Sequence, residues 1–226
     1  MTVGGNDFAL YLRGLVASWE GLAAPRPEAK VVRGNGFVAA RFPEPYLNNA
    51  VLFTPDAVES AADVYGSGEA YALWCLDDDE PTSDALAQRG YVHSETTRPM
   101  VRVLDDIPAP TATPVIDADL PRFADLLGVP AHLLTGVPAL RAYADSRYDS
   151  GLVLQRAEED VYVSMVFTRP EARGRGLATA VLKAALHEAR ADGATTATLQ
   201  STPMAEGLYL RYGFRPVGRW QEWVTG

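Results

Sequence analysis

The chain has 226 residues, of which 47% are hydrophobic and 22% are charged, the proportions of a folded globular protein rather than a disordered or fibrous one. Its 20 Lys and Arg against 29 Asp and Glu give a formal net charge of −9, which argues against nucleic acid or an anionic membrane as a partner. The length corresponds to one large domain or two small ones.

Cysteine and histidine usage indicates the compartment and argues against a metal site. Cys75 is the single cysteine, so a disulfide within the chain and a multi-cysteine zinc site are both excluded, and its apolar neighbours predict a core position. His93, His132 and His187 are scattered, so we expect no bound metal. No stretch approaches the roughly 18 apolar residues of a membrane span, and the N-terminal stretch lacks a leader pattern. We therefore expect a cytoplasmic protein.

Hydrophobic periodicity predicts alternating strands and helices on both sides of a proline-rich connection at 105–121. Before the connection the pattern predicts helices over 8–19, 55–65 and 82–88, and strands over 36–41, 49–53, 70–76 and 97–104. After it the pattern predicts helices over 120–127, 138–143, 177–192 and 204–212, and strands over 151–156, 161–168, 195–201 and 218–224. We accordingly expect an α/β fold with two domains, over 1–108 and 115–226.

The two halves end in the same order of strand, polar turn, short helix, small turn and strand, within 71–104 and within 196–224. This order indicates a divergent internal repeat. Only the second copy contains the run Arg173-Gly174-Arg175-Gly176, which we call the Arg/Gly loop, between the strand 161–168 and the helix 177–192.

The Arg/Gly loop has the layout of an anion-binding site. Glycines let the backbone turn tightly and approach a ligand, the first N–H groups of a helix lack intrahelical partners, and the helix dipole adds partial positive charge. Arg173 and Arg175 supply full charges. The loop suits a pyrophosphate, although it matches neither the dinucleotide-binding GxGxxG motif nor the phosphate loop GxxxxGK[ST].

Two motifs in this half resemble a known family. Arg173-x-x-Gly176-x-Ala178 matches the (Arg/Gln)-x-x-Gly-x-(Gly/Ala) coenzyme A loop of the GNAT superfamily of N-acetyltransferases, and the run from Tyr209 to Phe214 resembles its Tyr-x-x-x-Gly-Phe element. The two occur in the family's order and spacing. The resemblance covers residues 115–226 well and the first half weakly, and Thr202 stands where the family often has an Asn.

The resemblance implies a mixed, mostly antiparallel sheet flanked by helices, in a tandem whose first half is a degenerate GNAT-like or accessory α/β domain. It also implies acetyl-CoA as cosubstrate, held where the fourth and fifth strands of the second half separate. Backbone groups of Val166, Phe167 and Thr168 would contact the pantetheine and the acetyl carbonyl. The pyrophosphate would lie on the loop and first helical turn, formed by Arg173, Gly174, Arg175, Gly176, Leu177, Ala178 and Thr179.

The chemistry implied by the resemblance is direct acetyl transfer to a primary amine, with Tyr209 as general acid for the leaving thiolate. Tyr212, three residues further along the same helix, is the weaker candidate for that role. The general base stays open between a carboxylate and a water chain leading to solvent. Asp160 is one carboxylate candidate, and Glu158 and Glu159 are alternatives. An alternative function is a non-catalytic acyl-CoA-binding or sensor protein that retains the loop.

The acceptor is expected to be a small-molecule or peptide amine, bound by a monomer or a homodimer. The first half would cover the acceptor side of the cleft and set its specificity. Asn48 and Asn49 form a polar pair inside an apolar segment, and they could line that cleft.

Overall fold

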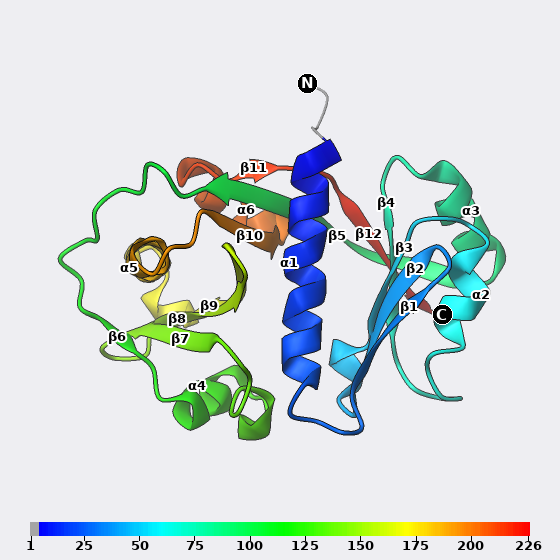
Figure 1. Ribbon diagram of the computed structural model, residues 1–226, viewed down its shortest axis with the longest axis horizontal. Coiled ribbons are helices and arrows are strands. Elements are labelled where there is room, and N and C mark those ends of the chain that lie inside the picture. The colour runs from blue at the N-terminus through cyan, green and yellow to red at the C-terminus, as the bar shows by residue number, and fades with distance from the viewer. Residues whose placement is uncertain (1–4) are drawn as a thin grey trace.

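The computed structural model describes residues 5–226, which form one large mixed sheet with helices on both faces (Figure 1). Residues 1–4 lie outside the described residues. They belong to the expected first half and to the N-terminal stretch in which no leader is expected. The strands in sheet order are β1 (Lys30–Gly34), β2 (Phe37–Arg41), β3 (Asn49–Leu52), β4 (Ala72–Leu76), β12 (Trp220–Thr225), β5 (Tyr91–Val103), β10 (Thr196–Ser201), β9 (Asp160–Thr168), β8 (Ser150–Ala157), β7 (Leu140–Asp145) and β6 (Val115–Asp117), and the short β11 (Arg215–Pro216) pairs with β5. Only β3–β4 and β9–β10 are parallel among these pairs, so the expected mixed, mostly antiparallel sheet is confirmed.

The helices make two outer layers. Helix α1 (Gly5–Ala23) crosses the centre of one sheet face and packs on strands of both halves, and α4 (Leu120–Leu127) extends the same layer. The other face carries two separate cores: α2 (Ala57–Ala62) and α3 (Glu80–Gln88) cover the first half, and α5 (Leu177–Ala191) and α6 (Pro203–Arg211) cover the second. The central position of α1 is clear in Figure 1. None of the helices in residues 5–226 is long and apolar enough to cross a membrane.

The two halves exchange strands at the centre of the sheet. The last strand, β12, pairs with β4 and with the first part of β5, so it is embedded in the first half. The second part of β5 pairs with β10, so it is embedded in the second half. We call β5 and β12 the exchanged strands. Because of this exchange, strands of residues 1–108 and strands of residues 115–226 pair with each other at the centre of one sheet. The division into domains over 1–108 and 115–226 stays a prediction.

Local sequence accounts for the helices nearest the site. Helix α4 begins where the Asp119 side chain accepts a hydrogen bond from the Arg122 N–H at 3.0 Å, and it ends at Gly128 in the left-handed conformation. Helix α5 begins after Gly176, whose φ is 75°. Its buried stripe of Ala180, Val181, Ala185, Leu186 and Ala189 faces the sheet, which confirms the predicted apolar face.

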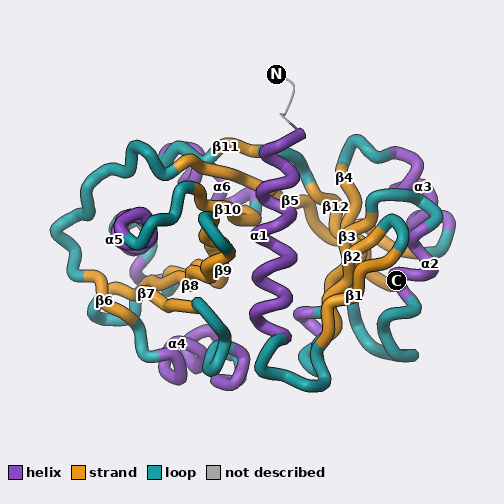
Figure 2. The backbone as a smooth tube through the Cα atoms, in the orientation of Figure 1, coloured by secondary structure: helices purple, strands orange, loops and turns teal. Residues whose placement is uncertain are grey.

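The structure corrects one predicted element and adds three. The segment 138–143, predicted as a helix, is the start of β7, where Ala142, Tyr143 and Ala144 are buried between β6 and β8. Its alanines favour a helix locally, and pairing with two neighbouring strands overrides that preference. Strands β1, β6 and β11 were not predicted. Strand β6 lies inside the expected connection, most of which is a long peripheral loop (Figure 2).

Candidate functional site

A gap opens between β9 and β10 where their pairing stops. The parallel register runs from the pair Thr196 and Asp160 to the pair Leu199 and Val163. Beyond it, Gln200 and Ser201 continue to pair with β5 on one side, while the end of β9 stays with β8 on the other. We call this opening the strand gap, and it lies where the resemblance places acetyl-CoA.

A bulge at Met165 shapes the β9 side of the strand gap. Met165 has a φ of 50°, in the left-handed region, and the register between β8 and β9 shifts at this point. Neither Met165 nor Val166 has a register partner on β8 or β10. A bulge leaves backbone groups outside the regular ladder, so this stretch of β9 is the part of the edge where a ligand in the strand gap would meet the Val166 backbone.

The end of β9 is fixed by Ser150 at the start of β8. The Ser150 hydroxyl donates to the Phe167 carbonyl at 2.8 Å and lies 2.9 Å from the Thr168 hydroxyl. The Phe167 ring packs edge to face on Phe123 of α4 with centroids 5.4 Å apart. Phe167 therefore contributes to the core, whether or not its backbone also contacts a ligand.

The Arg/Gly loop follows β9 directly and is exposed. Gly174 and Gly176 have φ values of 74° and 75°, and a Cβ atom added to either would meet nothing within 4 Å. Positive φ is the reason for glycine here, and the open space leaves the backbone accessible to a ligand. The first N–H groups of α5, from Leu177, Ala178 and Thr179, precede the first helical hydrogen bond, which Ala180 donates to the Gly176 carbonyl.

The two arginines of the loop are free enough to bind an anion. Arg173 makes a 3.4 Å hydrogen bond from Nε to the Thr168 carbonyl, and Arg175 lies 3.7 Å from Asp149. Exposed ion pairs of this kind contribute little energy because water and salt screen them. The loop, the helix N-terminus and both guanidinium groups thus form a cationic cradle at the mouth of the strand gap.

Tyr209 lies in the last turn of α6 and is 4% exposed. Its ring packs edge to face on Phe214, with centroids 5.7 Å apart. Burial raises the pKa of Tyr209 to about 12, so the phenol is protonated across the physiological range. Burial also raises the pKa of Tyr162 on β9, and Tyr209 is close enough to contribute to that increase. Tyr209 therefore lies in the core on the α5 and α6 face of the sheet, whereas Tyr212 is half-buried beside Lys183.

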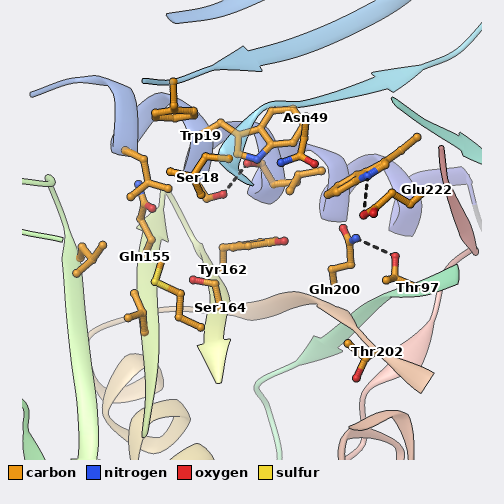
Figure 3. Close-up of a pocket in the computed structure, with 18 of the residues that line it drawn as sticks. Ser18, Trp19, Asn49, Thr97, Gln155, Tyr162, Ser164, Gln200, Thr202 and Glu222 are labelled. Atoms are coloured by element: carbon orange, nitrogen blue, oxygen red, sulfur yellow. Dashed lines mark hydrogen bonds between the residues drawn. The ribbon is translucent and has the colours of Figure 1, made fainter. Parts of the chain in front are cut away.

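A cavity of about 340 Å³ opens on the opposite, α1 face of the strand gap (Figure 3). Ser164 and Met165 of β9 and Thr202 after β10 line its gap end. We call it the central cavity, because strands of both halves and helix α1 enclose it. Its walls are mostly apolar, from Leu15, Trp19, Leu22, Phe42, Leu47, Trp74, Leu140, Val153, Tyr162 and Met165.

A chain of hydrogen bonds runs from the buried core to Gln200 and Thr97 in the wall of the central cavity. Trp220 Nε1 donates to the Tyr11 hydroxyl at 3.1 Å, which donates to Gln200 Oε1 at 2.6 Å. Gln200 Nε2 then donates to Thr97 Oγ1 at 2.8 Å (Figure 3). The chain joins α1, β10 and both exchanged strands, so it fixes the two halves around the cavity.

The structure distinguishes among the residues proposed as general base or as lining of the acceptor cleft. Asp160 is buried at the paired end of β9, where its carboxylate accepts hydrogen bonds from Thr196 at 2.8 Å and Thr198 at 2.6 Å. It lines no part of the central cavity, so the geometry disfavours it as general base. Asn48 is also structural, because it accepts from the Phe42 N–H at 2.7 Å. Asn49, in contrast, lines the central cavity.

Two carboxylates in the cavity wall were missed by the sequence analysis. Glu222 on β12 and Glu95 on β5 are register partners. Glu222 accepts a 3.2 Å hydrogen bond from Trp74 Nε1. The alternation of Trp220, Glu222 and Val224 indicates a shared face, but the partner of Glu222 depends on the strand exchange, which the sequence does not reveal.

The other singled-out residues are accounted for simply. Cys75 is fully buried, which confirms the predicted core position, and burial raises its pKa to about 12. His93, His132 and His187 are exposed. Within residues 5–226, no group of three or more His, Cys, Asp or Glu side chains is placed to hold a metal.

Part of the second half is similar to a known protein family. Residues 140–223 match the family model of the acetyltransferase (GNAT) domain. This part of the chain is therefore similar to a GNAT domain. The match begins with β7 and ends within β12, so it includes β9, the Arg/Gly loop, α5 and Tyr209. No curated protein matches the sequence.

Solved structures share the fold over nearly the whole chain. A GCN5-related N-acetyltransferase from Kribbella flavida is 17% identical with a TM-score of 0.72, over 95% of each chain. A GCN5-related N-acetyltransferase-like protein from Streptococcus suis is 14% identical with a TM-score of 0.58, over 95% of this chain and 98% of its own. A tandem GNAT protein from the clavulanic acid biosynthesis pathway is 14% identical with a TM-score of 0.53, over 100% of this chain and 96% of its own. The GNAT fold is therefore confirmed, and it supports acyl transfer in general.

Proposed function

We propose that this protein transfers an acetyl group from acetyl-CoA to a primary amine. The observation that carries the proposal is the strand gap itself, with the cationic Arg/Gly loop directly after β9 and a bulge at Met165 and Val166 on its β9 edge. Buried Tyr209 lies in the core on the α5 and α6 face. The pyrophosphate of coenzyme A fits the loop, and the pantetheine arm fits the strand gap. The acceptor amine would then bind in the central cavity, on the opposite face of the sheet.

In the proposed reaction, the amine nitrogen attacks the thioester carbonyl carbon and the carbon–sulfur bond breaks. The Val166 N–H is the candidate donor to the carbonyl oxygen as its negative charge develops. Tyr209 gives its proton to the departing thiolate and regains one from solvent. The attacking amine loses its proton to water in the central cavity, which has an open path to solvent. Val166, Phe167 and Thr168 at the end of β9 thus remain proposed contacts of the pantetheine and acetyl groups.

In this proposal the first half does not bind coenzyme A. In its own parallel pair, β3 and β4, the first strand is followed by Phe53-Thr54-Pro55-Asp56 and the short α2, with no arginine or glycine run. An acidic residue before a short helix disfavours a pyrophosphate. We therefore infer that the first half is a degenerate copy that binds no coenzyme A and instead forms one wall of the acceptor cavity.

The test of acetyl transfer is thiol release from acetyl-CoA in the presence of a panel of primary amines, with the acetylated product identified by mass spectrometry. The proposal predicts amine-dependent release of free coenzyme A in equal amount to the product. Tight acetyl-CoA binding without turnover on any amine would instead support the alternative, a non-catalytic acyl-CoA sensor.

Replacing both loop arginines with alanine, Arg173→Ala with Arg175→Ala, is expected to weaken acetyl-CoA binding about 10-fold to 100-fold. Charge-assisted hydrogen bonds to phosphate contribute about 1.5–3 kcal/mol each, and solvent exposure reduces that value here. Calorimetric titration measures the change. The matched control is Arg190→Ala with Arg211→Ala, which removes the same charge from exposed positions on α5 and α6 and should leave the affinity unchanged. Equal weakening by both pairs would contradict binding at the loop.

A further inference from the structure

The charge in the central cavity is of one sign. Of the residues that line the cavity, only Glu95 and Glu222 are ionisable as acids or bases near neutral pH, and both are acidic. They face each other across the exchanged strands, and Trp74 follows in the same cross-strand row on β4. Glu222 is half-buried and Glu95 is exposed. Neighbouring carboxylates repel each other when no cation lies between them, so this row favours a positively charged occupant.

The surroundings of Glu222 support the same occupant. Burial, followed by the neighbouring Glu95 carboxylate, raises the pKa of Glu222. His93 on β5 is the basic group that faces it, and the Trp74 side chain approaches from β4 through its N–H. A bound ammonium group would relieve the repulsion between the two carboxylates. The ring faces of Trp19 and Trp74, with centroids 6.2 Å apart, add a surface that also attracts cations.

The carboxylate row is separated from the strand gap. The last pair of β10 with β5 joins Ser201 and Arg98, and Glu95 lies three residues further along β5. At about 3.3 Å per residue, the backbone separation is roughly 10 Å. A carboxylate at this distance does not touch an amine that is attacking a thioester in the gap. The cation bound there therefore belongs to a different part of the acceptor.

The central cavity is small and mostly apolar. Leu15, Trp19 and Tyr162 line it, and its volume of about 340 Å³ is at the lower end of the range for small-molecule sites. Gln155, on the opposite wall from Glu222 in Figure 3, is 5% exposed and has a single long hydrogen bond, 3.5 Å from Nε2 to the Ala17 carbonyl. Its amide is thus available to a polar group of a ligand. A folded protein surface does not fit into such a cavity.

We infer that the acceptor is a small diamine, with one amine at the strand gap as nucleophile and a second, cationic amine bound between Glu95 and Glu222. This inference rests on the proposed function, because it assigns the acceptor of the same site. The apolar body between the two nitrogen atoms would pack on Trp19 and Trp74. The specificity for the second charge would come from the exchanged strands, and it would therefore require both halves of the chain.

The test compares 1,5-diaminopentane with 1-aminohexane and 6-aminohexanoate, which replace the second ammonium with a methyl or a carboxylate group. We expect kcat/KM to be at least tenfold higher for the diamine than for either analogue. Glu222→Gln and Glu95→Gln should each raise KM for the diamine about tenfold, with kcat and the monoamine kinetics nearly unchanged. Glutamine at 222 keeps an oxygen for the Trp74 N–H. Asp84→Asn, which removes an exposed charge on α3, is the matched control and should change none of these values.

Binding without acetyl-CoA separates this inference from the proposed function. Trp19 and Trp74 line the cavity, so their fluorescence reports its occupancy by the same three probes. Selective binding of the diamine, lost in Glu222→Gln, would support the inference even if no acetyl transfer occurred. Acetyl transfer with equal kcat/KM for the diamine and the monoamine would overturn it and leave the proposed function intact. Equal weakening of both amines by Glu222→Gln would also overturn it.

Discussion

Tyr209→Phe is expected to lower kcat by about 100-fold or more, with the dissociation constant of acetyl-CoA changed less than about twofold. The substitution removes only the hydroxyl, so the departing thiolate loses its proton donor while the packing of the ring on Phe214 remains. Single-turnover kinetics should be used, because slow product release would hide a change in the chemical step.

The control for this variant is Tyr212→Phe, which removes a hydroxyl from the same helix three residues later. It should leave kcat within about twofold of the wild type. Since burial raises the pKa of Tyr209 to about 12, the wild-type rate should also show no fall from loss of the Tyr209 proton up to about pH 10. Full single-turnover activity of Tyr209→Phe would remove this residue as the general acid.

The second large effect is expected from separating the two halves. A cut between Pro110 and Thr111, in the exposed connection, should give two fragments that are each unable to fold alone. The second fragment loses β5, so β10 is left with an unpaired edge, and the buried Met100 and Leu104 no longer cover its core. The first fragment loses β12, which pairs with both β4 and β5.

Co-expression of the fragments 1–110 and 111–226 is the matched control, because together they supply every strand. We expect circular dichroism to show cooperative thermal unfolding for the co-expressed pair and none for either fragment alone. A cooperatively folded 111–226 fragment that binds acetyl-CoA would contradict the structural role assigned to the exchanged strands. It would instead support two independent domains at the predicted boundary.

Much of the second half could be predicted because its information is local. The apolar stripe of α5, the glycines at positive φ and the residues that cap α4 each act within a few positions of the chain. The Arg/Gly loop and Tyr209 were found because a motif and its flanking strand and helix occur together. These features are enough to propose a coenzyme site without knowledge of long-range pairing.

The acceptor side could not be predicted in the same way, because it depends on contacts between distant segments. Glu222 meets Glu95 only because β12 inserts between β4 and β5, more than a hundred residues away in the chain. Similarly, α1 becomes a wall of the central cavity through the hydrogen bond from Tyr11 to Gln200. The helix predicted over 138–143 failed for the same reason, since strand pairing overrode a local preference.

Calorimetric titration of the full-length protein with acetyl-CoA tests the central claim most directly, with dephospho-CoA and ATP as controls. The account predicts one binding site per chain with a dissociation constant of about micromolar, near −8 kcal/mol. It also predicts much weaker binding of ATP, which lacks the pantetheine arm that enters the strand gap. Absence of binding by a folded protein at millimolar acetyl-CoA would contradict the account, because the Arg/Gly loop and the strand gap would then be structural features without this ligand.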